Sequence, residues 1–344
     1  MNIQDLIRPT IKALKPYSSA RDEFQGVTAD MVFLDANENP FENGVNRYPD
    51  PQQGALKAIL SKTKGLPTNQ ILFGNGSDEV LDLIFRAFCE PNQDNVVILP
   101  PTYGMYEVLA NLNAIGIKKV NLDAEFQPEV GAVLNAADEN SKLLFICSPN
   151  NPSGNSFNTE AIERLVSNFK GIVVVDEAYI DFSNEASWIS KLDTYPNLIV
   201  AQTLSKAYGM AGIRLGICYA STEIITVLNT IKPPYNINEL TQKKAIELLN
   251  IKDLASNQIK DILTQRSALI SELESVSYVS KIYPSDANFV LVKVDDATKR
   301  YNQLIEKGIV IRNRTTQPGC DNTLRLTVGT PQENKILIDT LKSI

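Results

Sequence analysis

Short apolar runs rich in β-branched residues alternate with helical patterns between about residue 70 and residue 220. Near-continuous apolar strands separated by helices are typical of a mostly parallel sheet that helices cover on both faces. We therefore expect an α/β domain over this part of the chain. Its predicted strands are 95–99, 142–147, 172–175, 198–200 and 213–219. Its predicted helices are 77–89, 103–113 and 158–169.

The pattern changes after Pro233 and Pro234. A long helical stretch is expected at 239–274, and the mixed strands and helices that follow it are typical of a smaller α+β domain. The strands are expected at 278–283, 288–294, 309–311 and 324–328, and the helices at 297–307 and 332–343. The first thirty residues lack a core pattern of their own, so we expect them to pack on the smaller domain. The predicted division is 31–235 for the large domain, and 1–30 with 236–344 for the small one.

Composition and charge narrow the class of protein. The chain has 344 residues, of which 43% are hydrophobic and 21% are charged, as in ordinary soluble globular proteins. The formal net charge of -7 and the lack of a Lys/Arg cluster argue against a nucleic-acid partner. The start of the sequence lacks the pattern of a signal peptide, and no apolar run has membrane-spanning length, so we expect a cytoplasmic protein without a membrane partner.

The cysteine and histidine contents exclude several kinds of site. The four cysteines are scattered and form no C-x-x-C pair, so neither a metal site nor a disulfide framework is expected. The chain contains no histidine, which excludes Ser-His-Asp catalysis, an H-E-x-x-H zinc site and an imidazole base. Any proton transfer must therefore use Lys, Tyr, Asp, Glu, Cys or a cofactor.

The segment from Thr203 to Gly216 is the strongest candidate for chemistry. Lys206 lies there among small and hydroxylated residues. A partly buried lysine with a lowered pKa is a nucleophile, and it characteristically forms a Schiff base with an aldehyde. Ser205 and Arg214 are residue types that hold a phosphate. Taken alone, the segment is also compatible with a structural turn and a solvated lysine.

Polar motifs follow two further predicted strands, at 148–154 and 176–179. In open α/β sheets, ligands bind outside the carboxyl ends of the strands. Asp176 is suited to pair with a protonated pyridine nitrogen, while Asn151 and Tyr179 are suited to contact an oxygen on the same ring. The alternatives are a turn aspartate and a plain Pro-Gly turn.

Two weaker signals lie nearer the N-terminus. Gly74 to Glu79 precedes an apolar helix, and a helix N-terminus presents unpaired N–H groups to an anion. Ser77 is also plausible as the N-cap of that helix; this interpretation is compatible with anion binding and is the one favoured when the motif is taken alone. Tyr103 offers an aromatic face for stacking, although a tyrosine near a helix start is more often part of the core.

Taken together, these motifs are those of a known family. N-N-P-S-G, D-E-A-Y and S-K-A-Y-G-M-A-G-I-R closely resemble the aspartate-aminotransferase-like (fold type I, class II) pyridoxal-phosphate enzymes. P-Y-S-S-A-R, L-D-A-N-E-N-P, R-Y-P and L-R-L-T-V-G-T extend the resemblance over nearly the whole chain. It implies a large domain with a mostly parallel seven-stranded sheet, a smaller α+β domain, and a homodimer.

The resemblance also implies roles for individual residues. Lys206 would bind pyridoxal 5'-phosphate covalently, Asp176 would pair with its ring nitrogen, and Tyr103 would stack on the ring. Tyr48 would reach the phosphate of the neighbouring subunit's cofactor. The other cofactor-binding residues that the resemblance implies are Ser77, Asp78, Asn151, Tyr179, Thr203, Ser205 and Arg214.

Substrate residues follow from the same resemblance. Arg325 matches the arginine that binds the substrate carboxylate, and Arg312, thirteen positions earlier, would assist it. Arg312 is also compatible with a solvated charge at a strand end. Tyr17 and Asn37 match substrate-side positions. The chain is most similar to family members that act on histidinol phosphate and glutamate or 2-oxoglutarate. Another amino-acid aminotransferase, aromatic for example, or a threonine-phosphate decarboxylase of the same fold stays open as an alternative.

Overall fold

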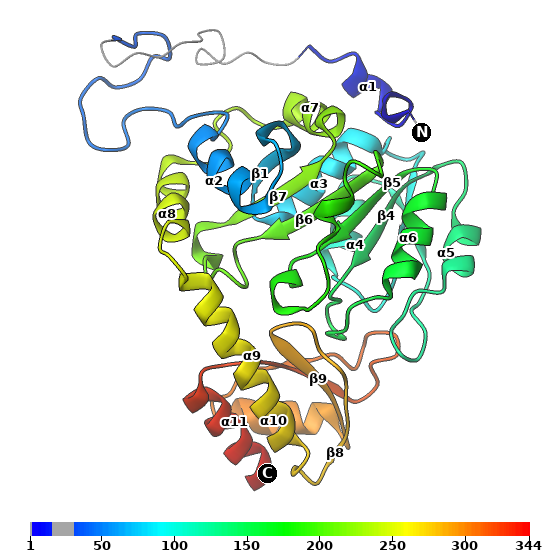
Figure 1. The fold of residues 1–344 in the computed structure, drawn as a ribbon. Helices are drawn as coiled ribbons and strands as arrows, with labels where there is room; N and C mark the ends of the chain where they lie inside the picture. The colour runs from blue at the N-terminus through cyan, green and yellow to red at the C-terminus, as the bar shows by residue number, and fades with distance from the viewer. Residues whose placement is uncertain (1, 16–30) are drawn as a thin grey trace.

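The computed structural model describes residues 2–15 and 31–344 (Figure 1). Its larger part is a seven-stranded sheet of order β1-β7-β6-β5-β4-β2-β3, in which β7 alone runs antiparallel to its neighbours. The strands are Ile71–Asn75 (β1), Asn95–Ile98 (β2), Gly116–Lys119 (β3), Ser141–Cys147 (β4), Ile172–Asp176 (β5), Leu198–Thr203 (β6) and Leu215–Ala220 (β7). The five predicted strands are confirmed. The apolar pattern did not reveal β1, which runs into a glycine motif, or β3, a partly exposed edge strand that contains two lysines.

Helices cover both faces of this sheet because the side chains of each buried strand alternate between two cores. α3, α4 and α7 pack on one face, and α2, α5, α6 and α8 pack on the other. The helices are Gly54–Lys64 (α2), Ser77–Phe88 (α3), Met105–Leu112 (α4), Val130–Ala136 (α5), Thr159–Asn168 (α6), Thr222–Ile231 (α7) and Glu239–Leu249 (α8). The fold is therefore the α/β arrangement that the sequence predicts.

The N-terminal residues lie against this large sheet layer. Ile3–Asp5 (η1) and Pro9–Lys12 (α1) are the elements described in this region, and Ile3 and Ile7 are buried in the same core as α3. The Arg8 N–H donates to the Ala87 carbonyl oxygen at 3.0 Å. The prediction that this region packs on the small domain is wrong for residues 2–15, because two isoleucines are too short a pattern to reveal the partner. Residues 16–30 lie outside the described residues.

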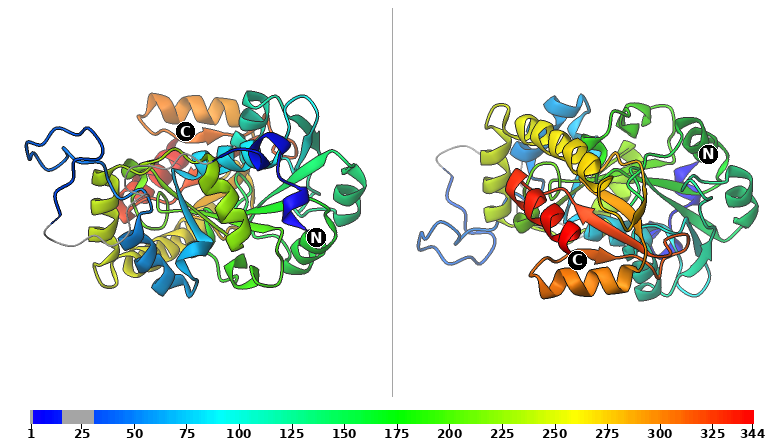
Figure 2. Two further views of the ribbon diagram at one scale, coloured as in Figure 1. Left: turned by 90° about the horizontal axis from the view of Figure 1, so that it is seen from above. Right: turned by 90° about the horizontal axis from the view of Figure 1, so that it is seen from below.

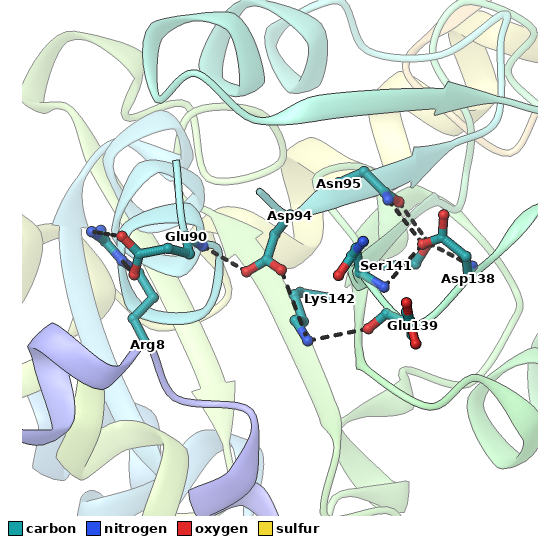
Figure 3. Close-up of polar contacts among 9 residues, drawn as sticks. Arg8, Glu90, Asp94, Asn95, Asp138, Glu139, Ser141 and Lys142 are labelled. Atoms are coloured by element: carbon teal, nitrogen blue, oxygen red, sulfur yellow. Dashed lines mark hydrogen bonds and ion pairs between the residues drawn. The ribbon is translucent and has the colours of Figure 1, made fainter. Parts of the chain in front are cut away.

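Figure 3 shows the polar contacts that fix this end of the molecule. The Arg8 guanidinium contacts the Glu90 carboxylate at 3.2 Å, and the Glu90 N–H donates to Asp94 at 2.7 Å. Asp94 in turn lies 3.8 Å from the Lys142 ammonium, while Asn95 donates to Asp138 at 2.9 Å. These groups surround the amino ends of β2 and β4, so they brace the edge of the sheet opposite the strand-end motifs.

The smaller part contains a four-stranded antiparallel sheet of order β10-β11-β9-β8. Its elements are Leu254–Leu273 (α9), Val279–Ile282 (β8), Phe289–Val294 (β9), Ala297–Glu306 (α10), Arg312–Asn313 (β10), Thr323–Thr327 (β11) and Pro331–Ser343 (α11). The strand predicted at 309–311 is wrong, since the short β10 begins only at Arg312. The helix predicted at 239–274 is two helices, because the chain turns at Asp253, whose φ is +58°.

The helix break bears on the division into domains. Ala245 of α8 belongs to a core of the large sheet, whereas Leu269 and Leu273 of α9 belong to the core of the small sheet. Figure 1 shows α9 leading from the large layer to the small sheet. We infer that the domains divide between α8 and α9, later in the chain than residue 235.

Candidate active site

A pocket lies where the carboxyl ends of β4, β5 and β6 meet the start of α3. It is lined by Ser77, Asp78, Tyr103, Cys147, Asn151, Asp176, Ala178, Tyr179, Thr203, Ser205, Lys206 and Arg214. All of these residues except Cys147 and Ala178 were predicted from the sequence. Parallel strands bring their ends to one edge, which is why motifs far apart in the chain meet here.

Lys206 lies in the tight loop that follows β6. The loop is closed by the Leu204 N–H, which donates to the Leu215 carbonyl at 3.1 Å, and by Gly209, whose φ is +65°. The Lys206 ammonium lies 5.9 Å from the centre of the Tyr179 ring. Desolvation lowers the pKa of Lys206, and the positive charges of Arg325 and Arg214 lower it further. The site therefore favours the neutral, nucleophilic amine.

Asp176 is the buried carboxylate at the end of β5. The Tyr106 hydroxyl donates to its Oδ2 at 2.7 Å, and the Ala178 N–H donates to its Oδ1 at 3.1 Å. Desolvation raises the pKa of Asp176, and these two hydrogen bonds oppose that rise. Tyr106 was not predicted from the sequence, because a tyrosine inside an apolar helix has the pattern of any other core residue.

The start of α3 and Arg214 form the cationic end of the pocket. The N-cap of α3 is Gly76, and no side chain caps the helix, so Ser77 is its first residue and not its N-cap. A Cβ on Gly76 would lie 2.6 Å from the Arg214 guanidinium. Glycine thus allows the guanidinium to lie directly beside the unpaired N–H groups of the helix, as an anion site requires.

Asp78 and Tyr103 flank this end of the pocket. The Tyr103 hydroxyl donates to Asp78 Oδ1 at 2.9 Å, and Asp78 lies 3.7 Å from Arg214. Burial and the charge of Asp78 raise the pKa of Tyr103, so its phenol stays protonated at neutral pH. Nearby, the Ser205 N–H donates to the Thr203 hydroxyl at 3.1 Å. Hydroxyl groups thus complete the lining next to the cationic end.

Asn151 and Tyr179 join the pocket to the small sheet. The Asn151 side-chain oxygen accepts a hydrogen bond from the Arg325 guanidinium, and burial raises the pKa of Tyr179. Arg325 in β11 lies opposite Arg312 in β10, and its guanidinium lies 5.0 Å from the centre of the Phe289 ring. The structure therefore brings both predicted substrate arginines to neighbouring strands. A third arginine beside them, Arg314, was not predicted.

Comparison with known proteins agrees with this geometry. The family described as aminotransferase class I and II matches residues 28–341. The chain belongs to this family. It is similar to the Flavobacterium johnsoniae protein named histidinol-phosphate aminotransferase, with 63% identity over 99% of this chain and 98% of that one.

Solved structures agree in fold. The histidinol-phosphate aminotransferase of Clostridium acetobutylicum matches 87% of this chain and 90% of its own, with a TM-score of 0.80 and 24% identity. The Sinorhizobium meliloti enzyme, solved in complex with pyridoxal-5'-phosphate, matches 86% of this chain and 82% of its own, again with a TM-score of 0.80 and 24% identity.

The residues of this aminotransferase fit the family's cofactor, pyridoxal 5'-phosphate. A phosphate suits the uncapped start of α3 beside Arg214, and the lysine that reacts with an aldehyde lies in the same pocket. The buried carboxylate of Asp176 is suited to a protonated ring nitrogen, because a cationic partner would offset its desolvation. The protein is a pyridoxal-phosphate-dependent transaminase.

Three predicted residues of the aminotransferase lie elsewhere or are not described. Tyr48 is 52% exposed and stacks on Tyr235 with ring centres 4.4 Å apart. Asn37 is exposed as well, and both residues belong to a segment, 31–50, that extends away from the body of the protein (Figures 1 and 2). Tyr17 lies outside the described residues. Tyr48 and Asn37 thus do not line the cofactor pocket of their own chain.

Proposed function

We propose that this aminotransferase transfers an amino group between histidinol phosphate and 2-oxoglutarate. The observation that carries the proposal is the pair of arginines on β10 and β11, of which Arg325 is hydrogen-bonded to Asn151 in the pocket. A paired guanidinium site suits both a phosphate and the distal carboxylate of glutamate. The name of the 63% identical Flavobacterium relative supports the same substrate.

Each pocket residue then has a defined task. The bound cofactor supplies an electron sink that stabilises negative charge on the substrate α-carbon. The amine of Lys206, whose pKa is lowered by its surroundings, accepts the α-proton and later returns one. Asp176 would keep the ring nitrogen of the cofactor protonated, and Tyr103 would cover one face of its ring.

Other residues hold the cofactor and the substrate in place. We assign the phosphate of the cofactor to the N–H groups of Ser77 and Asp78, the hydroxyl groups of Thr203 and Ser205, and Arg214. Asn151 and Tyr179 are assigned to bind the oxygen on the cofactor ring. Arg312 and Arg325 would bind the substrate phosphate in one half-reaction and a glutamate carboxylate in the other. Tyr17 and Asn37 are assigned to the substrate side of the site.

We further propose that the enzyme is a homodimer. The segment 31–50 carries Val32, Leu34 and Phe41, whose exposed fractions are 82%, 87% and 79%. Exposed apolar residues grouped on one projecting segment mark a surface that another protein covers. A second copy of the chain would cover it in a symmetric dimer, and Tyr48 would then reach the partner's cofactor phosphate.

We propose that the enzyme is located in the cytoplasm, as expected for an enzyme of amino-acid biosynthesis. No helix in residues 2–15 or 31–344 is long and apolar enough to cross a membrane.

A spectral titration of the bound cofactor tests the proposed reaction. We expect histidinol phosphate to change the cofactor absorbance at lower concentration than phenylalanine or threonine phosphate, and 2-oxoglutarate to restore it. Lys206→Ala should lack turnover, because no other amine among residues 2–15 and 31–344 lines the pocket. A faster reaction with phenylalanine, or carbon dioxide release from threonine phosphate without an oxo acid, would assign the protein to one of the alternatives.

A further inference from the structure

The pairing of β10 with β11 places a third arginine on the face of the small sheet that carries Arg312 and Arg325. Arg312 pairs with Arg325 and Asn313 with Leu324. The Arg314 N–H continues the ladder by donating to the Thr323 carbonyl at 2.9 Å. Side chains alternate along a strand, so Arg312, Arg314 and Arg325 share a face, while Leu324 points into the core of the small domain.

These arginines lack a negative partner in the described part of the chain. No carboxylate there forms an ion pair with any of the three guanidinium groups, and the Nε atoms of Arg314 and Arg325 are buried without a hydrogen bond. Burial lowers the pKa of Arg314, and the charges of Arg325 and Arg312 lower it further. Arg314 and Arg325 are partly buried, and Arg312 is exposed. Partly buried guanidinium groups that repel one another without an anion are costly, so the arrangement indicates that an anionic ligand belongs there.

Arg314 is linked to the pocket through Arg325, which lies on the neighbouring strand and whose guanidinium donates to Asn151 of the pocket. Its charge and that of Arg325 both act on the Tyr179 phenol, which lines the cofactor pocket. The backbone that carries Arg314 is fixed on both sides, because its carbonyl accepts from the Gln317 N–H at 2.9 Å and its N–H is bonded to Thr323. The side chain of Arg314 therefore starts from a fixed point just after β10, beside Arg325.

We propose that Arg314 is a specificity-determining residue that adapts the substrate's anion subsite to a phosphate monoester dianion. The proposal rests on the proposed function. A phosphate monoester carries a charge of about -1.5 to -2 at pH 7 and has three acceptor oxygens, whereas a carboxylate carries one charge on two oxygens. Arg312 and Arg325 suffice for a carboxylate. A third cation adds attraction mainly for the phosphate dianion. Arg314 would therefore raise the affinity for histidinol phosphate more than the affinity for glutamate, although both substrates use the same subsite.

The test compares the two half-reactions in the cofactor-loaded enzyme. For Arg314→Gln, the histidinol phosphate concentration that gives half-maximal absorbance change should rise at least about tenfold, a loss of about 1.4 kcal/mol. The corresponding value for glutamate should change much less. For Arg314→Lys, the half-maximal histidinol phosphate concentration should lie between those of the wild type and Arg314→Gln, because lysine keeps the charge but lacks the planar guanidinium. Lys307→Gln, which removes an exposed lysine after α10, is the control for net charge and should behave as wild type.

A binding measurement without turnover completes the test. Inorganic phosphate should bind the cofactor-loaded wild type more tightly as pH rises and the dianion forms, and Arg314→Gln should weaken this binding and flatten its pH dependence. Thermal unfolding of each variant checks the fold. Equal losses for histidinol phosphate and glutamate, or unchanged phosphate binding in Arg314→Gln, would overturn the inference. A wild type inert toward histidinol phosphate would refute the proposed function instead, while the phosphate measurement would still test Arg314.

Discussion

Tyr106 holds Asp176 in a chain that has no histidine to do so. Its hydroxyl donates to the carboxylate at 2.7 Å, and its ring is fully buried against Phe145, with ring centres 4.8 Å apart. Burial and the charge of Asp176 raise the pKa of Tyr106, so the phenol is a neutral donor at neutral pH. A neutral donor stabilises the charged form of Asp176 but leaves the negative charge of the carboxylate available to pair with the protonated ring nitrogen of the cofactor.

Replacement of Tyr106 by phenylalanine should move the acid limb of the activity to higher pH. The hydrogen bond lowers the pKa of Asp176 against the effect of burial, so its loss raises that pKa and the carboxylate is protonated sooner as pH falls. We expect a loss of stability of about 1 kcal/mol as well. The pH profiles of kcat/KM and of cofactor absorbance measure the shift, with Tyr301→Phe on α10 as control. Superimposable profiles would show that Tyr106 serves packing alone.

At the scale of elements, the contact between β7 and the start of α3 shapes the phosphate end of the site. Gly216 lies opposite Gly74 on one side and Thr203 on the other. A Cβ on Gly216 would lie 2.3 Å from the backbone of Gly76 and Ser77. Only glycine lets strand and helix approach this closely, and the approach places the helix N–H groups beside Arg214.

Gly216→Ala should therefore weaken cofactor binding. The atoms that the new methyl group meets are backbone atoms, so the start of α3 must move away. We expect about 1–3 kcal/mol of destabilisation and at least about a tenfold loss of cofactor affinity. Gly212→Ala is a matched control, since its Cβ would meet nothing within 4 Å. Fluorescence titration with the cofactor and thermal unfolding measure both effects; equal behaviour of the two variants would contradict the argument.

For the whole molecule, the projecting segment 31–50 is the feature that a single chain does not explain. Leu34 and Phe41 expose most of their surface, and Glu38 accepts hydrogen bonds from within the segment, from the Tyr48 N–H at 2.6 Å and the Arg47 guanidinium at 2.8 Å. The segment is thus internally ordered but covers little of its own chain (Figures 1 and 2). Burial of such side chains in a dimer would contribute about 25 cal/mol for each Å² removed from water.

Leu34→Glu should weaken self-association, because a charge would be buried in the proposed interface. Sedimentation equilibrium over a range of concentrations measures the dissociation constant. Val310→Glu is the matched control, because Val310 is 81% exposed and lies in the small domain. A wild type that is monomeric at every concentration, or equal effects of the two changes, would refute the proposed dimer interface.

The residues of the candidate site were easier to predict from the sequence than the packing of the N-terminal residues. Asp176 ends an apolar strand, and Asn151 and Lys206 follow two others; such strands are recognisable from a few neighbouring residues. Tyr106 and Arg314 were missed because their roles depend on partners far away in the chain, Asp176 in one case and Arg325 in the other. The docking of Ile3 and Ile7 was mispredicted for the same reason.

The sequence by itself determined the alternation of strands and helices, the chemical groups at the strand ends and the exclusion of histidine chemistry, because these depend on local pattern and composition. The tertiary structure alone decided which of those groups meet. It set the distance from Tyr106 to Asp176, the approach of β7 to α3, and the shared face of the three arginines. Those features come from strand register and packing between distant segments, which no local pattern contains.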